Sequence, residues 1–454
     1  MTEAGKADVA VASGPAPGAL HRVLGLGFGI AIVIGNAVSA TFNTSAQVAQ
    51  VLSDGTLILL AWAVGGLYAF LGANAQAELG AMLPLEGGPY AYARHAYGEY
   101  GGFIVGWADW IANSAAVAAF TLLIGQSLAE IWPAVGRASG SIAAGSVIVF
   151  AALNWIGIRV GDGVQKAMSA LWALVLLAFV VAAWAWSGPV PGGPAAPALA
   201  GGGHLGTLTA FLVAQRFVLY AYGGWNAPLY FAEEHRDARR HLPRAMFGGV
   251  ALMMALYLLV NAALLRVLPV EPLRSSTLPL VTATRVLAGE WTAAALVILT
   301  VVALLGGLNA NILSTPRTLF AMARDGLFAR RAAAVNRGGT PGVALWITAG
   351  AILAFIVSGT YDELLSVFAS VSVANDMLLV LAVLLLRRRE PGRARPYRAW
   401  GYPWTPLALL AVDLALGVGL VVGSPAQTAW ALALLGCSIP AYLLVRRGRR
   451  ASRA

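Results

Sequence analysis

The sequence predicts an all-α integral membrane protein of about twelve transmembrane helices. Three observations lead to this class: hydrophobic residues make up 59% of the 454-residue chain, charged residues make up only 11%, and the mean hydropathy is +0.74. A soluble domain carries roughly a quarter charged residues and has no interior large enough for so much apolar surface. Lipid must therefore be the solvent for much of this chain.

Twelve apolar runs are long enough to cross a bilayer, for which a helix needs about twenty residues. They fall at about 24–50, 56–83, 99–130, 141–158, 164–187, 207–232, 245–268, 290–316, 343–358, 364–386, 403–422 and 428–445. A Pro/Gly-rich loop at 187–206 follows the fifth run and an Arg-rich loop at 387–398 follows the tenth. We therefore expect a disordered tail at 1–21, five-helix repeats at 22–187 and 207–386, two more helices at 401–446 and a basic tail at 447–454.

The net charge of +10 is distributed as the positive-inside rule requires of a membrane protein. Most of the 30 lysines and arginines lie in loops or tails on one side of the predicted spans. Those at the opposite ends of helices are Arg137, Arg266, Arg274 and Arg285. This asymmetry predicts a multi-pass protein of the cell (inner) membrane with both termini in the cytoplasm. The basic charge therefore reflects topology, and we expect no nucleic-acid partner.

The residues that usually hold metals or perform catalysis are sparse. The chain has one cysteine, so it can form neither an internal disulfide nor a cysteine-based metal cluster. The histidines, which all fall in predicted loops, are His21, His95, His204, His235 and His241. No His pair and no Ser/His/Asp constellation is expected at one membrane level. We therefore expect no enzyme, no metal and no cofactor.

The first and sixth spans contain residues that interrupt helices near their centres. The first carries Gly35, Asn36 and the run Ser39-Ala40-Thr41, and the sixth carries Tyr-Ala-Tyr-Gly-Gly-Trp-Asn-Ala-Pro at 220–228. Non-helical backbone at bilayer depth survives only where protein or a water-filled cavity satisfies it. Breaks at corresponding places of two five-span units predict a midplane binding site between inverted repeats. The alternative is that the glycines only permit close helix packing.

Four stretches resemble the amino acid–polyamine–organocation transporters. They are LPLEGGPYAY at 83–92 with 98–107, 217–226 with 232–245, PRTLFAMARDGL at 316–327 with Thr340-Pro341, and 395–403. The motifs are most similar to the L-type amino acid transporter and basic amino acid–polyamine antiporter branches. The resemblance, which covers about Val23 to Leu444, implies a leucine-transporter-like fold. That fold has two inverted five-helix repeats, discontinuous helices 1 and 6 and two extra C-terminal helices, and it carries amino acids or amines by alternating access.

A zwitterionic substrate at the midplane needs donors for its carboxylate and acceptors for its amino group. The break at Asn36–Thr41 is expected to offer backbone N–H groups at the positive end of a helix dipole, helped by the hydroxyls of Ser39 and Thr41. Carbonyls freed around Gly35 and around 220–223 are expected to accept from the amino group. The resemblance implies a Gly-Ser-Gly-like triplet in the first break, where this chain has the bulkier Ser39-Ala40-Thr41.

Further binding residues come from the third and sixth spans. Tyr220 matches the aromatic lid that closes over substrate in L-type relatives, and Asn226 either holds the break together or contacts substrate. Asp109, Ala112 and Asn113 share one helix face. The resemblance matches Ala112 and Asn113 to substrate-contacting positions of arginine/agmatine antiporters. The predicted substrate-binding residues are Gly35, Asn36, Ser39, Ala40, Thr41, Asp109, Ala112, Asn113, Tyr220, Ala221, Tyr222, Gly223 and Asn226.

Charged residues inside the spans supply candidates for gating or coupling. A carboxylate in lipid costs about 2.5–3.5 kcal/mol on insertion scales, so Asp109 must bind a substrate amine, relay a proton or pair with an internal donor. Glu78 serves as an anchor or a gate, and Arg216 lines an outer vestibule or snorkels. Tyr220 and Trp225 complete this set. Polar residues expected to form helix-packing hydrogen bonds are Asn309, Asn311 and Asp376.

The coupling mode and the substrate stay open at this point. Proton-coupled relatives often carry a lysine in the fifth span where this chain has Trp172, so the resemblance assigns neither proton symport nor exchange. The alternatives are a permease, an amino acid/amine exchanger and a non-transporting amino acid sensor. Asp109 alone weakly favours a basic amino acid, whereas the span-six motif favours neutral ones. Expected partners are a small substrate and membrane lipid, with proton coupling and the choice of monomer or homodimer left open.

Overall fold

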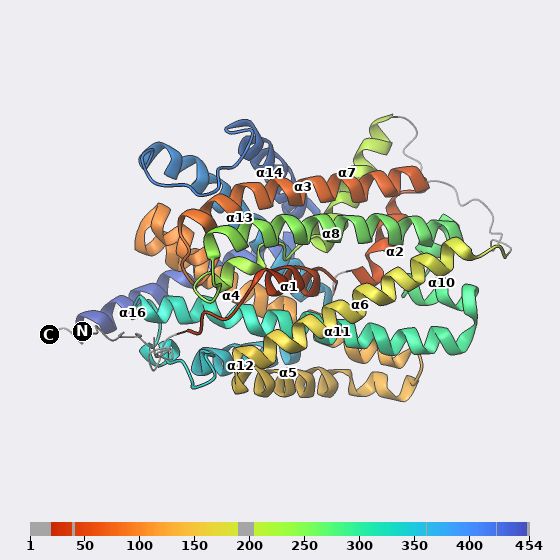
Figure 1. Ribbon diagram of the computed structural model, residues 1–454, viewed down its shortest axis with the longest axis horizontal. Coiled ribbons are helices and arrows are strands. Elements are labelled where there is room, and N and C mark those ends of the chain that lie inside the picture. The colour runs from red at the N-terminus through yellow and green to blue at the C-terminus, as the bar shows by residue number, and fades with distance from the viewer. Residues whose placement is uncertain (1–19, 39–40, 189–203, 360, 424, 452–454) are drawn as a thin grey trace, which may run out of the picture.

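The computed structural model describes residues 20–38, 41–188, 204–359, 361–423 and 425–451. Long helices lie side by side along one axis of the molecule (Figure 1). Within the described ranges, nine helices are long and apolar enough to cross a membrane. The predicted tail at 1–21 and the loop at 187–206 lie mostly outside these ranges, and the division into two five-helix repeats stays a prediction.

The elements follow the order of the predicted apolar runs, and each run overlaps at least one helix. The first part contains α1 (Leu26–Val38), α2 (Thr41–Val51), α3 (Gly55–Met82), α4 (Pro89–Ala129), η1 (Pro133–Ala138), α5 (Ser139–Ile156) and α6 (Ile158–Ala185). The second part contains α7 (His204–Ala221), η2 (Ala227–Phe231), α8 (Ala238–Val267), α9 (Val270–Arg274), α10 (Pro279–Ala288), α11 (Glu290–Arg324), η3 (Arg330–Ala333), α12 (Gly342–Ser358) and α13 (Tyr361–Arg389). The last helices are α14 (Trp404–Gly423), α15 (Pro425–Gly436) and α16 (Ser438–Ala451).

Two features differ from the predicted pattern. The third span was predicted to begin at 99, but α4 extends back to Pro89 across a kink at Gly98, whose φ of +82° suits glycine. The loop before α11 contains the short helices α9 and α10, which the apolar pattern did not predict because neither is long enough to span lipid.

The sixth span is divided between two elements, whereas the predicted break in the first span falls on residues outside the description. In the first span, α1 ends at Val38 and α2 begins at Thr41, on either side of residues outside the description. In the sixth, α7 ends at Ala221, residues 222–226 form turns, and η2 follows. Gly224, at φ +91°, lies so close to Asn36 that an added Cβ would stand 2.5 Å from the Asn36 Cβ. The ends of α1 and α7 are therefore in direct contact.

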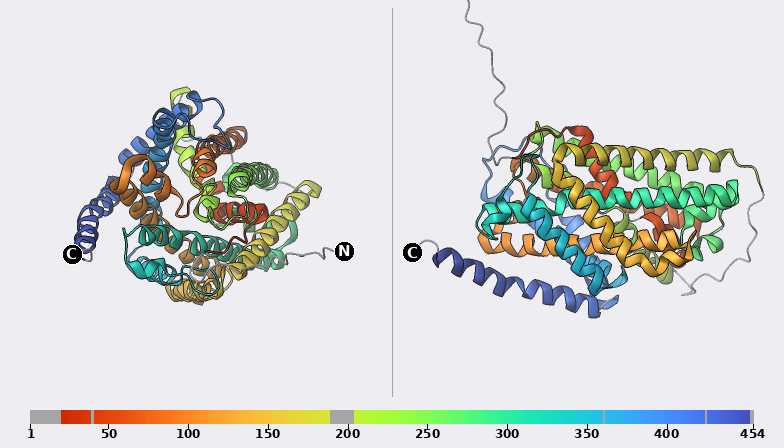
Figure 2. Two further views of the ribbon diagram at one scale, coloured as in Figure 1. Left: turned by 60° about the vertical axis from the view of Figure 1, so that its left-hand side comes forward. Right: turned by 90° about the horizontal axis from the view of Figure 1, so that it is seen from below.

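Helix packing places α1 at the centre of the bundle, where it contacts α6, α8 and α11 (Figure 1). Around it, α4 runs along α11 and α13, and α3 runs along α8. Glycines on α3 allow these close approaches: a Cβ on Gly66 would meet Met254 of α8, and one on Gly72 would stand 2.5 Å from the Trp225 ring. The chain ends with α16, which lies against the outside of the bundle (Figure 2).

The outer surface of the bundle is apolar, as lipid requires. On α6, Leu174, Val181 and Trp184 are 64%, 67% and 55% exposed, although Trp172 and Leu176 on the same helix are buried. A helix that is apolar on both its buried and its exposed face is a membrane span rather than a surface helix of a soluble domain. The structure is thus that of a multi-pass membrane protein.

Candidate functional site

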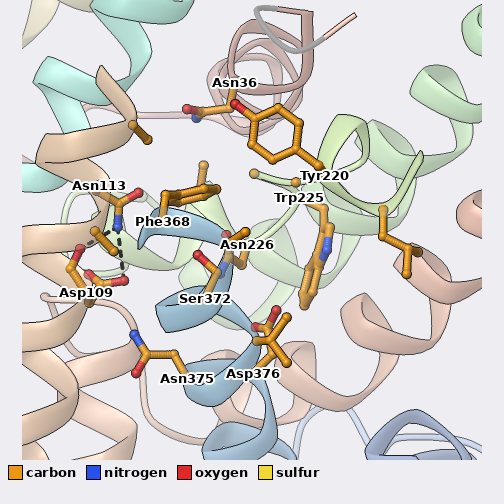
Figure 3. Close-up of a pocket in the computed structure, with 18 of the residues that line it drawn as sticks. Asn36, Asp109, Asn113, Tyr220, Trp225, Asn226, Phe368, Ser372, Asn375 and Asp376 are labelled. Carbon is orange, nitrogen blue, oxygen red and sulfur yellow. Dashed lines mark hydrogen bonds between the residues drawn. The ribbon is translucent and has the colours of Figure 1, made fainter. Parts of the chain in front are cut away.

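A cavity of about 160 Å³ lies where the ends of α1 and α7 meet (Figure 3). Its wall combines aromatic and apolar side chains from α4, α7, α13 and α14 with many polar ones. The polar and charged lining residues are Asn36, Tyr68, Asp109, Asn113, Arg216, Tyr220, Asn226, Tyr230, Asn311, Ser314, Ser372, Asn375 and Asp376. Polar groups inside a membrane protein are costly and usually functional, so this cavity is the candidate substrate site.

Asp109 on α4 is held by three neutral donors. Its Oδ1 accepts from the Tyr230 hydroxyl at 2.7 Å and from the Asn113 amide at 3.1 Å, and its Oδ2 accepts from the Thr318 hydroxyl at 3.0 Å. Among the described residues, no Lys, Arg or His forms an ion pair with it. The carboxylate is therefore fixed in position beside the cavity by η2 and α11 and keeps its charge unpaired.

One face of α13 forms the opposite wall (Figure 3). Phe368, Ser372, Asn375 and Asp376 follow the i, i+4, i+7 and i+8 spacing that puts side chains on one side of a helix. Asp376 Oδ1 accepts from the Gln76 amide at 2.9 Å. Sequence reasoning treated Asp376 as a packing residue and missed its three neighbours, although the polar spacing in the tenth span was the signal that could have identified this face.

Aromatic rings close the cavity on the α7 side. The Tyr220 ring lies 6.0 Å from that of Phe368 in an edge-to-face arrangement and 6.3 Å from that of Phe120, both measured between centroids. Arg216 lies one turn before Tyr220, and its guanidinium stacks on the Phe217 ring at 4.9 Å. Tyr220 therefore forms part of an aromatic cover, with a cation next to it.

The structure brings most of the predicted binding and gating residues to this cavity. Those in its wall are Asn36, Asp109, Ala112, Asn113, Arg216, Tyr220, Gly223, Trp225 and Asn226. The side chain of Asn36 also donates to the Ile32 carbonyl at 3.1 Å. Their contact with substrate stays a prediction.

Other predicted residues lie elsewhere. Gly35 packs against Gln165 and Ser169 of α6. The Ala221 carbonyl accepts from the Tyr257 hydroxyl at 2.9 Å, and the Tyr222 hydroxyl donates to the Trp62 carbonyl at 2.9 Å. The acceptor expected at Ala221 is therefore engaged in helix packing, and Tyr222 points away from the cavity. Ser39 and Ala40 lie outside the described residues, as does the side chain of Thr41.

Glu78, predicted as an anchor or a gate, lies outside the cavity near the end of α3. Its carboxylate accepts from Arg387 at 2.5 and 2.9 Å, from Arg395 at 3.1 Å and from the Ala399 N–H at 2.7 Å. These contacts join α3 to the end of α13 and the loop that follows it. The geometry favours the anchoring interpretation.

A neutral polar network holds α1 in place near Trp172, which is itself buried in the apolar core. The Ser169 hydroxyl donates to the Ala31 carbonyl at 2.8 Å. Gln165 Oε1 accepts from the Asn309 amide at 2.9 Å, and Asn309 Oδ1 accepts from the Asn154 amide at 2.8 Å. Asn309 thus has the predicted packing role, and the network links α1, α5, α6 and α11 without a charged group.

A buried ion-pair cluster lies one turn beyond the cavity on α11, since Arg317 follows Ser314 by about 4.5 Å along the axis. The Arg317 guanidinium lies 2.5 Å from Glu234 and 3.2 Å from Glu86, and it stacks on the Phe231 ring at 4.1 Å. All three charged side chains are buried. Sequence reasoning used these residues only as family motifs, because nothing in the sequence indicates that they meet.

The same cluster joins distant segments. Leu24, just before α1, donates its N–H to the Glu234 carbonyl at 3.0 Å and accepts from the Arg236 N–H at 3.0 Å. Burial raises the pKa of Glu86 well above its ordinary value, with the charge of Glu234 adding to the effect and that of Arg317 opposing it. Two acidic side chains therefore share one guanidinium at this end of the cavity.

Comparison with known proteins agrees with this architecture. A family model described as amino acid permease matches residues 23–440. The serine/threonine exchanger of Bacillus subtilis is 29% identical over 405 residues, which cover 86% of this chain and 89% of that protein. The human Asc-type amino acid transporter 1 is 28% identical over 441 residues (90% and 82% covered), and the human b(0,+)-type amino acid transporter 1 is 28% identical over 426 residues (88% and 83% covered).

Proposed function

The chain belongs to the amino acid permease family, and from this premise we propose that it is an alternating-access exchanger whose substrate binds in the cavity between α1, α4, α7 and α13. Amino acid transport itself follows from the family and from the relatives. The exchange mode, the location of the site, and a fold of twelve spans in two inverted five-helix repeats are our proposals. So is an orientation in the cell membrane with both termini in the cytoplasm.

One observation carries the proposed site: the break after α7 meets α1 at the cavity. Within the described residues, the N–H groups of Gly224, Trp225 and Asn226 make no backbone hydrogen bond, and all three residues line the cavity. The carbonyls of Val218, Tyr220 and Ala221 at the end of α7 are already engaged, by the Tyr222 N–H, the Gly223 N–H and the Tyr257 hydroxyl. Unpaired N–H donors at one place are what the carboxylate group of a zwitterion requires, and they support binding at this point.

The arrangement of the cytoplasmic end supports alternating access. The Arg317 cluster lies directly beyond the cavity and joins α11, the loop before α4 and the segment after η2. A route from the cavity to the cytoplasm that passes through this cluster would separate the two acidic side chains from the guanidinium. Such a contact has two discrete arrangements, closed and open, and this is the property that a gate needs.

Exchange is favoured over simple uptake by a named relative, and the fifth span offers no proton site at the position of the family lysine. The Bacillus subtilis relative is described as an exchanger. The network around Ser169 and Gln165 contains no titratable group, and Trp172 occupies the position where proton-coupled relatives carry a lysine. Nothing at this position can take up a proton during the cycle.

Transport by the purified protein in proteoliposomes tests the proposal. We expect uptake of labelled amino acids into vesicles preloaded with unlabelled amino acid, and little uptake into empty vesicles. Equal uptake into both would refute exchange and leave the permease alternative. Substrate binding without uptake into either would identify a sensor. A pH gradient imposed on the same vesicles, with the pH on the cytoplasmic side of the protein held constant, is expected to leave the initial rate unchanged.

A further inference from the structure

We propose that the cytoplasmic half of the cavity is a cation subsite, so that the preferred substrates are amino acids whose side chain carries an amine or a guanidinium. We define the cation subsite as Asp109, Asn113, Ser372, Asn375 and Asp376, which all line the cavity. The inference rests on the proposed function, because it requires that the cavity holds the substrate.

The subsite lies at the end of the cavity away from the meeting point of α1 and α7. Figure 3 places Asn36 and Tyr220 at one end and Asp109, Asn375 and Asp376 at the other. Asp109 and Ala116 both line the cavity, and seven residues of helix span about 10 Å. The four-carbon stem of a lysine reaches about 6 Å. A substrate gripped at the helix breaks can therefore extend its side chain to the two carboxylates.

The subsite presents acceptors that nothing in the described structure uses. Asn375 is only 7% exposed and points into the cavity, yet its amide hydrogen-bonds no described residue (Figure 3). Asp376 receives one hydrogen bond, from Gln76 to Oδ1, and its Oδ2 accepts none from the described residues. Together with the Ser372 hydroxyl, these oxygens can accept the three hydrogen bonds that an ammonium group donates.

Acidic side chains gather at this end of the cavity. Neither Asp109 nor Asp376 forms an ion pair with a described Lys, Arg or His. A third carboxylate stands behind the wall, because Tyr68 lines the cavity and its hydroxyl donates to the buried Asp413 at 2.6 Å. Arg216 is the cation in the lining, and it belongs to the Tyr220 end.

This balance favours a substrate that brings its own positive charge. Unpaired carboxylates inside a membrane protein are costly, and a cation that enters the site removes the penalty. A neutral side chain would leave it in place unless Asp376 took up a proton. The structure thus outweighs the sixth-span motif, which by itself favours neutral substrates.

A comparison of lysine with norleucine, which has the same stem without the ammonium group, tests the subsite. The full-length protein is reconstituted in vesicles preloaded with a mixture of neutral and basic amino acids, and the initial uptake of each labelled compound is measured. We expect the transport efficiency for lysine to exceed that for norleucine by at least about tenfold. Equal or greater efficiency for norleucine would overturn the subsite while leaving the proposed function intact. Absence of transport for every amino acid would instead refute the proposed function.

Asp376→Asn assigns the effect to the subsite. An asparagine Oδ1 can keep the bond from Gln76, so the variant is expected to fold, and retention of the parent's size-exclusion profile checks this. We expect the efficiency for lysine to fall at least about tenfold, because removing one partner of a buried charge pair usually costs more than one such factor. Norleucine uptake should be unchanged or higher. An unaltered lysine preference would refute the role of Asp376.

Two further variants complete the test. Asp162→Asn removes a carboxylate that pairs with Lys166 on α6, outside the cavity, and should leave both efficiencies unchanged. Asn375→Asp adds a carboxylate to the subsite and should increase the lysine preference. A norleucine preference in that variant would contradict the inference. If Asp376→Asn fails to fold, the cation subsite is still tested by the preference for lysine over norleucine in the unmodified protein and in Asn375→Asp.

Discussion

Replacing Arg317 by methionine is the sharpest perturbation of the proposed gate. The variant leaves Glu86 and Glu234 buried together without their shared guanidinium. Removing one partner of a buried ion pair costs about 3–5 kcal/mol. If the carboxylates become hydrated when the cytoplasmic end opens, this cost falls only on the closed form. Since about 1.4 kcal/mol corresponds to a factor of ten, the open form should gain at least about a hundredfold in population relative to the closed one.

Labelling of a single cysteine measures this shift. The chain has one cysteine, so Cys437→Ala gives a cysteine-free background, to which Ser314→Cys adds a thiol in the cavity wall. In inside-out vesicles, a membrane-impermeant maleimide should react at least about ten times faster when Arg317→Met is present. An unchanged labelling rate in a protein that elutes normally on size exclusion would refute the gate.

A matched control lies about two turns further along α11. Arg324 pairs with Glu233 at 2.6 and 2.8 Å, but both side chains are partly exposed. Partly exposed pairs contribute about 0–1 kcal/mol. Arg324→Met should therefore change the labelling rate by less than about fivefold. A large effect would mean that loss of any charge at this end opens the gate.

Four further predictions test other parts of the account. The gate should open more readily as cytoplasmic pH rises above 4.5, the ordinary pKa of a glutamate, because the closed form raises the pKa of Glu86 and therefore binds more protons than the open form. The rate of maleimide labelling should increase with pH accordingly, and Glu86→Gln should flatten this dependence. Gly224→Ala places a methyl group against Asn36 at a φ of +91°, and it should abolish uptake in a protein that still folds. Normal uptake would contradict the contact between α1 and the break after α7. Glu78→Gln weakens a buried ion-pair cluster and should lower the thermal midpoint of the detergent-solubilised protein without altering the apparent KM, whereas a KM effect alone would indicate gating. Asp109→Asn should reduce transport at least about tenfold, because it disturbs the hydrogen bonds that Tyr230 of η2 and Thr318 of α11 donate to this carboxyl group. Unchanged transport and unchanged pH dependence would refute a role for Asp109.

The sequence allowed prediction of the apolar helices and of the break in the sixth span because local composition controls both. Long apolar runs must become helices in lipid, and Gly-Gly followed by Pro weakens a helix wherever it occurs. The start of α4 was predicted less well. The helix extends back through Gly98 into a polar segment, and contacts with other parts of the protein, rather than the composition of the segment, keep it helical. The wall formed by α4 was predicted because Asp109, Ala112 and Asn113 share one face.

Contacts between distant segments were beyond such reasoning. Arg317 meets Glu86 and Glu234, which both precede it by more than 80 residues, and no local pattern pairs them. Asp376 was identified as a polar residue in a span, but its exposure to the cavity depends on the rotation of α13 against α4. The engaged carbonyl of Ala221 likewise depends on Tyr257 of α8. Sequence thus indicates where polar groups occur, and packing decides which of them stay available to a substrate.

A structure determined by electron cryomicroscopy with a saturating transported amino acid would test the central claim most directly. We predict density for the amino acid in the cavity beside Asn36, with its carboxylate within hydrogen-bond distance of the N–H groups at 224–226. Density at another location, or a continuous helix through 221–226 when substrate is bound, would contradict the account.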